Sequence, residues 1–438
     1  MNFVISTVNY FFWTYLLLPL TLFTSGYLTV KCRFFQFFKL KTIFKTAFSH
    51  NKNLKGTSPF GAMCVALSGT MGIGNIAGVG TALALGGVGA IFWMVVGAFL
   101  CMILKFSEVV LAMNYREGDR GGLMYVITNR LPKLYPLGIA FALLTVFSSV
   151  GTGGITQSGA SAVAMQSVFG TPKIITGIIF GAVVLIMLTF GANKLSKIAG
   201  AVVPILSGAF ILGCLFVIMR NYTQIPLAIK DIFSSAFNFK SVSGGTTGFL
   251  LSNSVRYGIS RGIFTNEAGM GTAPIVHASA QSTPFKQGCL GIFEVFFDTV
   301  VMCPITALAI ITTRSHLLCG VSPVNFTMYA FTSVFAQSGQ MFVALSTLFF
   351  GILASVGWSY YGKCCCKFLF KTNTSVRIYC VLFCVFTSLG ACIPELSIFE
   401  VADILNGLMM LPNLIVTLLL SPTIIFQTRF FRRVICTD

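Results

Sequence analysis

Two octets decide the fold of this chain: NIAGVGTA at residues 75–82 and NEAGMGTA at residues 266–273. They match at six of eight positions, 191 residues apart, and each lies within a long apolar run. Glycine lets a backbone leave helical geometry. Unwound backbone is tolerated at membrane depth only where it lines a cavity. The repeat therefore predicts two broken helices, side by side, that bound a ligand site; the plainer interpretation of the glycines is close packing of helices.

The composition around these octets is that of a membrane protein. The 438 residues are 55% hydrophobic and 9% charged, with a mean hydropathy of +0.87. Soluble proteins carry about 25% charged residues, so a soluble enzyme, a disordered protein and a secreted disulfide scaffold are excluded. A transmembrane β-barrel would alternate polar and apolar residues over short segments. Long apolar runs instead predict an all-α polytopic membrane protein.

Eleven runs are long enough to span a bilayer, which takes about 20 residues per helix. The chain has a net charge of +18. Lys and Arg favour cytoplasmic loops, and their distribution places the N-terminus outside and the C-terminus inside, so the charge reports topology and not nucleic-acid binding. The predicted spans lie near 3–30, 60–85, 89–114, 136–166, 173–191, 200–219, 246–275, 287–313, 339–361, 376–393 and 399–426.

The two octets divide the chain into two units of five spans. Because five is odd, the second unit must be inverted relative to the first, as in secondary transporters. The predicted organisation is an extra N-terminal helix (1–30), a basic cytoplasmic loop (31–59), a first repeat (60–219), an external loop or interfacial helix (220–245), a second repeat (246–426) and a basic cytoplasmic tail (427–438).

Further motifs occur between about residues 56 and 421. They read GTMGIGNIAG (69–78), ALALGGVGAIFWM (82–94), KFSEVVLAMNYRE (105–117), RYGISRGIFTNEAGMGTAP (256–274), FFDT (296–299), GWSYYG (357–362) and LNGLMMLPNL (405–414). In these motifs the chain resembles the alanine/glycine:cation symporters, which have a five-plus-five inverted-repeat fold. The resemblance implies import of alanine, glycine and, in some members, D-alanine together with sodium.

The resemblance also implies the site residues. Substrate contacts would come from the two broken helices and from the third helix of each repeat, namely Gly74, Asn75, Gly78, Gln157, Phe264, Thr265, Asn266 and Trp358. Neutral amides suit the ammonium and carboxylate groups of an amino acid, and the two aromatic residues would limit side-chain size. For each polar residue the alternative is an interhelical hydrogen bond.

The cation would bind backbone carbonyls near Met71 and Gly74 together with Ser355. The chain departs from the family pattern at four positions. Ile73 and Ala354 stand where hydroxyl residues are usual, and Gly154 and Gly159 stand where Asn is usual. Sodium is the expected co-transported ion, with a proton as the alternative and no other metal.

Charged residues within the spans are candidates for coupling or gating. Glu267 would accept amides of the broken helix or interact with the cation, and Arg256 and Arg261 would form an outer gate or reach toward water. Glu294 and Asp298 lie four residues apart on one helical face, with a basic partner still to be found. Lys105 and Glu108 are expected to anchor the inner end of their span.

These observations predict a symporter for small neutral amino acids in a bacterial inner membrane, with the bilayer and the substrate as partners. The sequence does not indicate an oligomeric state. The alternatives are a proton-coupled symporter of the same fold, a channel, and an intramembrane enzyme using Glu294 and Asp298. No nucleophile–base pair in the sequence favours the enzyme.

Overall fold

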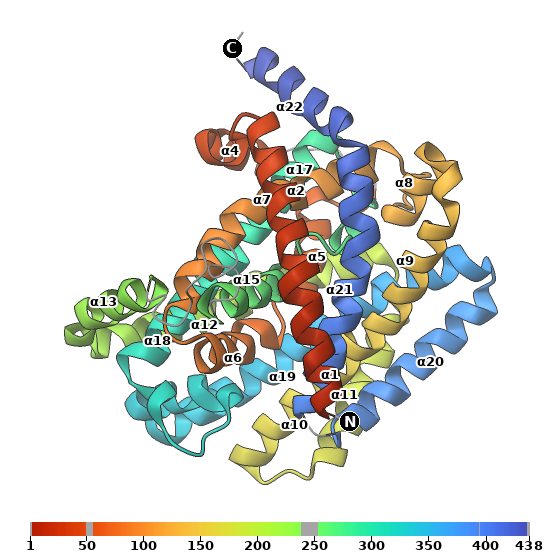
Figure 1. Cartoon of the computed structure of the whole chain (residues 1–438). Helices are drawn as coiled ribbons and strands as arrows, with labels where there is room; N and C mark the ends of the chain where they lie inside the picture. Colours follow the sequence, from red (N-terminus) through yellow and green to blue (C-terminus); the bar gives the residue numbers. More distant parts are fainter. Residues whose placement is uncertain (1, 50–55, 238–252, 394, 436–438) are drawn as a thin grey trace.

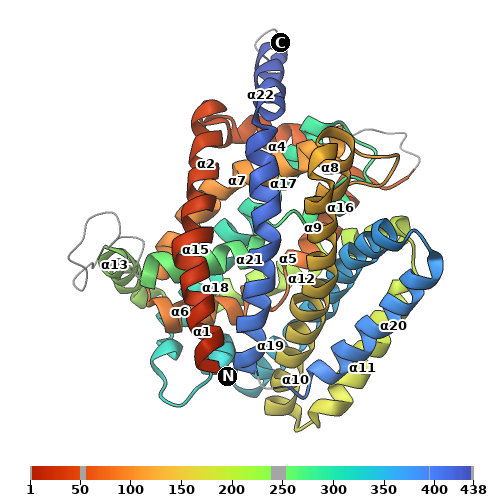
Figure 2. The same cartoon turned by 45° about the vertical axis from the view of Figure 1, so that its right-hand side comes forward.

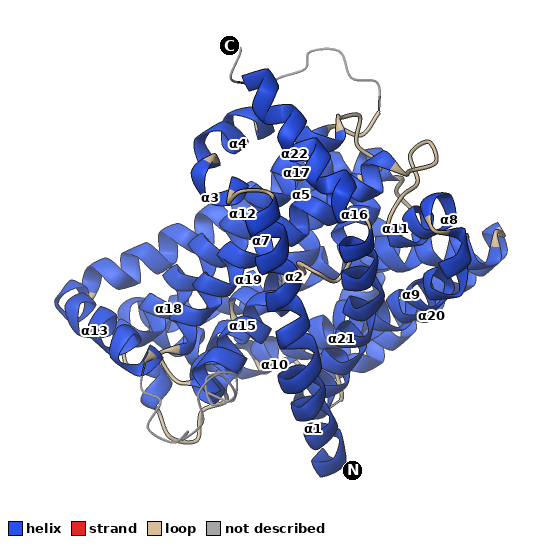
Figure 3. Ribbon diagram, turned by 45° about the horizontal axis from the view of Figure 1, so that its top comes forward, coloured by secondary structure: helices blue, strands red, loops and turns tan. Residues whose placement is uncertain are grey.

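The computed structural model describes residues 2–49, 56–237, 253–393 and 395–435. Within these ranges all the regular structure is helical, apart from two isolated β-bridges (Figure 3). The two ends of the chain lie at opposite ends of the molecule in both side views (Figures 1 and 2). This architecture agrees with the predicted all-α class.

The N-terminal helix is one run of three segments, α1 (Asn2–Phe11), the π-helical η1 (Phe12–Leu17) and α2 (Leu18–Lys31). It lies along α21 (Glu395–Leu419), and the two run side by side in Figures 1 and 2. Trp13 Nε1 donates a hydrogen bond to the backbone oxygen of Asp403 at 3.3 Å.

The first octet lies at a helix break. Helix α5 (Pro59–Thr70) is preceded by the N-cap residue Ser58, whose side chain accepts a hydrogen bond from Gly61 N. It ends at Thr70, and a short 3₁₀ turn, η2 (Ile73–Asn75), leads to α6 (Ala77–Gly86). The segment between α5 and α6 is fully buried, so its backbone groups depend on other parts of the protein for hydrogen bonds.

The second octet also lies at a break. Helix α15 (Asn253–Asn266) ends at the first residue of the octet, and α16 (Ala273–His277) begins at its last. Three residues between the two helices have positive φ: Glu267 (54°), Gly269 (89°) and Gly271 (76°). Left-handed backbone costs a residue with a Cβ about 1–2 kcal/mol, which explains two glycines here and leaves Glu267 strained.

The other helices pack around these two breaks. Helix α7 (Ala90–Asn114) lies against both α15 and α17 (Pro284–Val295). Helices α11 (Lys173–Leu188) and α20 (Asn373–Gly390) lie side by side at one edge (Figure 2). The remaining major segments are α9 (Tyr135–Ser148), η4 (Ser149–Ile155), α10 (Thr156–Phe169), α12 (Ala192–Arg220), η6 (Phe296–Met302), α18 (Cys303–Thr312) and α19 (Phe326–Phe370), which turns sharply at Ala336.

Eight helical segments in the described ranges are long and apolar enough to cross a membrane. The other three predicted spans have a clear physical reason for falling short. The spans at 60–85 and 246–275 are divided by the breaks, and residues 246–252 of the latter lie outside the described ranges. The span at 173–191 is α11, which has 16 residues.

Several predicted connections are helical. The basic segment at 31–59 contains α3 (Phe35–Phe38) and α4 (Leu40–Ala47), and α4 packs on α17, where Phe44 meets Phe293. The segment at 220–245 contains α13 (Ile225–Ala236). The last predicted span ends early at Leu419, and α22 (Ser421–Ile435) follows it. The shorter pieces are α8 (Leu123–Arg130), η3 (Pro132–Leu134), η5 (Tyr222–Gln224), η7 (Ser315–Leu317) and η8 (Pro323–Asn325).

Candidate functional site

A continuous chain of side-chain hydrogen bonds joins the two breaks. Asn75 Nδ2 donates to Asp298 Oδ1 at 2.8 Å. The other oxygen of Asp298 accepts from Thr299 Oγ1 at 2.8 Å, and Thr299 Oγ1 accepts from Asn266 Nδ2 at 3.1 Å. All four side chains are buried. The first residue of each octet is therefore held, through Asp298 and Thr299, to the first residue of the other.

The bridging pair lies in η6, a π-helical segment within the helix that runs from α17 to α18. π-Helical turns are rare and concentrate at functional sites. A second one, η4, ends at Ile155, two residues before Gln157, so two of the three π-helical segments in the described ranges lie beside the breaks. Nothing in the sequence distinguishes these turns from ordinary helix, so they were not predicted.

Gln157 closes the other side of the first break. Its Oε1 accepts a hydrogen bond from Ile73 N at 3.1 Å, which satisfies an amide that the break leaves without a helical partner. Gly72 lies directly against this side chain, since a Cβ at Gly72 would come within 2.6 Å of Gln157 Oε1. Across the break, a Cβ at Gly74 would lie 3.3 Å from Thr265. The structure thus brings Gly74, Asn75, Gln157 and Thr265 together, as predicted.

Two charged residues of α7 support the second break. Lys105 Nζ donates to the backbone oxygen of Asn266 at 2.8 Å. Glu108 accepts from Gly269 N at 2.5 Å and from Gly271 N at 2.8 Å, so one carboxylate satisfies two unwound amides. The expectation that Lys105 and Glu108 anchor an inner helix end is wrong: both are buried against the break. Burial of a charge is stable only with such partners.

The predicted cation residues lie around the first break and α19. Ser355 Oγ donates to Gly153 O at 2.5 Å, which leaves the hydroxyl lone pairs unused by this bond. Trp358 packs directly on Gly153 and meets Tyr361 edge to face. Met71 follows the last residue of α5 and is buried.

The four departures from the family pattern have two different surroundings. Ala354 lies at the break, because its Cβ would be 2.9 Å from a Cβ on Gly72, and the Ile73 side chain packs in a small cluster with Ala77 and Ala160. Gly154 and Gly159 instead face α20, at Thr387 and Gly390. Those two glycines therefore serve helix packing.

The remaining coupling and gating candidates, Glu267, Arg256 and Arg261, have different partners in different parts of the structure. Glu267 Oε2 accepts from Thr272 Oγ1 at 2.6 Å, within its own break. Arg261 pairs with Asp403 of α21, with Nη2 and Oδ2 2.6 Å apart, and its guanidinium also lies 5.5 Å from the Phe264 ring centre. Arg256 stacks on Tyr10 and Tyr257. Asp403 is thus a carboxylate partner for Arg261.

Glu294 and Asp298 lie on one helix but are bonded to different groups. Glu294 lies 3.0 Å from Lys105 Nζ and 3.0 Å from His277 Nε2, and these residues are the basic partners that the sequence left unnamed. Sequence reasoning also missed Thr299 and Asp403. None of these contacts could be predicted, because each joins elements whose relative position only the fold determines.

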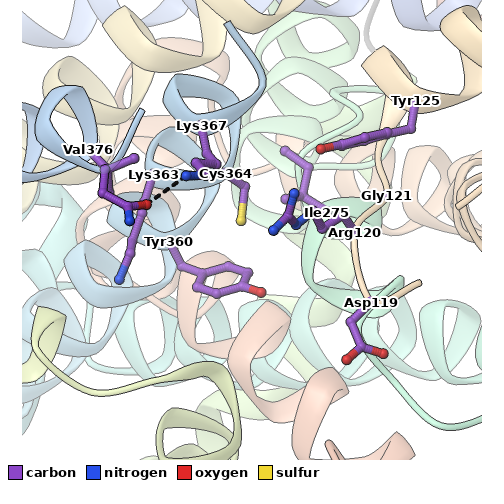
Figure 4. A pocket seen from close by; sticks show the side chains of 11 residues that line it. Asp119, Arg120, Gly121, Tyr125, Ile275, Tyr360, Lys363, Cys364, Lys367 and Val376 are labelled. Carbon is purple, nitrogen blue, oxygen red and sulfur yellow. Dashed lines mark hydrogen bonds between the residues drawn. The ribbon is translucent and has the colours of Figure 1, made fainter. Parts of the chain in front are cut away.

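A separate pocket of about 250 Å³ opens at the ends of α16 and α19 (Figure 4). The Arg120 side chain points into it toward Cys364, and Lys367 donates to Asn373 Oδ1 at 2.6 Å on the other wall. None of the predicted substrate residues lines it. The lining residues are Asp119, Arg120, Gly121, Tyr125, Ile275, Tyr360, Lys363, Cys364, Lys367, Asn373 and Val376.

Comparison with known proteins gives a consistent result along the whole chain. A model of the sodium:alanine symporter family matches residues 1–436. The sodium/alanine symporter AgcS of Methanococcus maripaludis is 36% identical, covering 99% of this chain and 98% of that protein. The probable sodium/glutamine symporter GlnT of Bacillus subtilis is 33% identical, covering 98% and 90%.

Solved structures of transporters share the fold. The crystal structure of MhsT in complex with L-phenylalanine aligns with a TM-score of 0.62 at 13% identity, covering 84% of this chain and 90% of that one. A manganese transporter mutant from Eremococcus coleocola aligns with a TM-score of 0.51 at 18% identity, covering 86% and 81%. At these identities the likeness concerns the fold alone.

Proposed function

The chain belongs to the sodium:alanine symporter family, and from this premise we propose that it imports alanine and glycine, and also D-alanine, together with sodium by alternating access. Relatives are named as transporters and symporters, which agrees with a multi-pass membrane protein without enzymatic activity. The observation that carries the proposal is the bonded link from Asn75 through Asp298 and Thr299 to Asn266. It holds two unwound segments against each other, where backbone amides and carbonyls can receive a zwitterion.

The proposed substrate site comprises Gly74, Asn75, Gly78, Gln157, Phe264, Thr265, Asn266 and Trp358. Family membership does not fix the substrate, since relatives are named for both alanine and glutamine. One methylene changes binding by only about 1–3 kcal/mol, so strong preference for a small amino acid needs a steric wall. Trp358 is 1% exposed and braced by Tyr361, which suits it for that role.

Sodium is the proposed coupled ion, bound by the backbone oxygens of Met71 and Gly74 and by Ser355. Hard cations take oxygen ligands, and the Ser355 hydroxyl keeps lone pairs for one. Ala354 supplies no such oxygen. Proton coupling is the second candidate, and it is favoured by the buried carboxylates Glu267, Glu294 and Asp298.

The test is uptake of labelled alanine into proteoliposomes under an inward sodium gradient, with choline and pH-gradient controls. We expect sodium-dependent accumulation, competition by glycine and weak competition by glutamine. Asn75→Ala should abolish uptake in folded protein. Accumulation driven only by a pH gradient would replace sodium by protons, and normal uptake by Asn75→Ala would remove the site assignment.

The proposed location is a bacterial inner membrane, with the N-terminus outside and the C-terminus in the cytoplasm. In this orientation the pocket of Figure 4 opens on the cytoplasmic side, at the inner ends of α16 and α19. We assign it to the path by which substrate leaves, because α16 begins where the second break ends.

A further inference from the structure

A second chain of buried contacts begins at the second break and leads away from the substrate site. Lys105 Nζ binds the backbone oxygen of Asn266 and lies 3.0 Å from Glu294 Oε1. The other oxygen of Glu294 lies 3.0 Å from His277 Nε2. Lys105, Glu294 and His277 are each 0% exposed, so these groups rely on one another and not on bulk water for their polar contacts.

The chain continues through Gln287 to the first broken helix. Gln287 Nε2 lies 2.7 Å from His277 Nδ1 and 3.2 Å from the backbone oxygen of Pro59. Pro59 is the first residue of α5, the half-helix that precedes the first break. Four residues, Lys105, Glu294, His277 and Gln287, thus connect the end of α15 to the start of α5, across α7, α16 and α17.

The donors and acceptors along this path are mutually consistent. An amide nitrogen can only donate, and the oxygen of Pro59 can only accept, which fixes the orientation of Gln287. Its second hydrogen then points to His277 Nδ1, so Nδ1 accepts and Nε2 carries the imidazole hydrogen toward Glu294. Glu294 is left with one neutral donor and one cation, Lys105.

We propose that Lys105, Glu294, His277 and Gln287 form a positioning relay that couples the substrate site to the inward half-helix α5. The proposal rests on the proposed function. If the start of α5 moves away from α17, the hydrogen bond between Gln287 and Pro59 must break. The Gln287 side chain is then free to turn and no longer fixes the His277 ring. Glu294 loses its fixed partner, and Lys105 loses its fixed position in turn. The hydrogen bond from Lys105 to the carbonyl of Asn266 therefore depends on the position of α5. Conversely, a change in the backbone at the second break alters the position that α5 prefers.

Cys64 provides a native reporter, because it lies in α5 and is 0% exposed. The experiment measures N-ethylmaleimide labelling of Cys64 by peptide mass spectrometry, in the reconstituted full chain, with and without sodium and alanine. In Gln287→Leu we expect Cys64 labelling to be at least fivefold faster than in the wild type and insensitive to sodium and alanine. Alanine binding should stay within about threefold of the wild type, while the maximal uptake rate falls at least tenfold.

Ser107→Ala is the matched control. Ser107 lies two residues from Lys105 on α7 and is equally buried, but its hydroxyl donates to Ile103 O of its own helix. In Ser107→Ala, the rate of Cys64 labelling and the rate of alanine uptake should match those of the wild type. Gln287→Asn, which is too short to reach both partners, should repeat the effect of Gln287→Leu if the latter does not fold.

Unchanged Cys64 labelling in folded Gln287→Leu or Gln287→Asn protein would overturn the relay. So would a parallel loss of alanine binding and uptake, since that is the signature of a general structural role. The ligand-free labelling rate needs no substrate. A wild type that fails to transport alanine would therefore count against the proposed function without affecting the comparison between variants.

Discussion

At the residue scale, Asp298 is the acceptor on which both asparagines depend. Asp298→Asn keeps the shape of the side chain but loses one of its two acceptor oxygens, so either Asn75 or Thr299 is left without its partner. A hydrogen bond to a charged group contributes about 1.5–3 kcal/mol. We expect kcat/KM for alanine uptake to fall about tenfold to a hundredfold. Thr306→Val loses a bond to Met302 O of the adjoining η6 turn and a contact with Cys214, but none to either asparagine, and should stay near the wild type. Equal losses in both variants would contradict the argument.

Lys105 and Glu294 form a second residue-scale case, in which stability and activity should separate. Lys105→Met leaves Glu294 buried without its cation, which costs about 3–5 kcal/mol. The double variant Lys105→Met/Glu294→Leu should recover much of that loss, because apolar replacement of a buried pair is often neutral. Transport should not recover, since the bond to Asn266 O is still missing. The measurement is the thermal unfolding midpoint in detergent, and a double variant no more stable than the single one would contradict it.

At the element scale, the first break depends on the absence of a side chain at Gly72. A Cβ there would lie 2.6 Å from Gln157 Oε1 and 2.9 Å from the Ala354 Cβ. Gly72→Ala should displace Gln157, leave Ile73 N without its acceptor and reduce uptake at least tenfold. Gly200→Ala in α12 meets nothing within 4 Å and should transport normally. Radiolabelled uptake normalised to folded protein compares the two, and normal transport by Gly72→Ala would show that the break tolerates repacking.

The elements also show how far sequence reasoning reaches. The repeated octets predicted both breaks, because glycine clusters within apolar runs have few other uses at membrane depth. The contacts of Lys105 were beyond prediction, since KFSE in an apolar run is equally consistent with an end anchor. Its partner at Asn266 is 161 residues away and meets it only because α7 packs on α15. The same holds for His277, whose role depends on α16 and α17 meeting beside α5.

At the scale of the whole molecule, topology follows from where basic loops can lie, and native cysteines test it. With the N-terminus outside, the loop after α18 and the end of α20 face outward, and Cys319 and Cys392 there are exposed. Cys364 lines the pocket of Figure 4, which opens on the opposite side. A membrane-impermeant maleimide added to intact cells should label Cys319 and Cys392 and spare Cys364, which should react only in inside-out vesicles. The reverse pattern would show that the topology is opposite to the proposed one. The uneven distribution of Lys and Arg would then need an explanation other than the preference of positive charge for cytoplasmic loops.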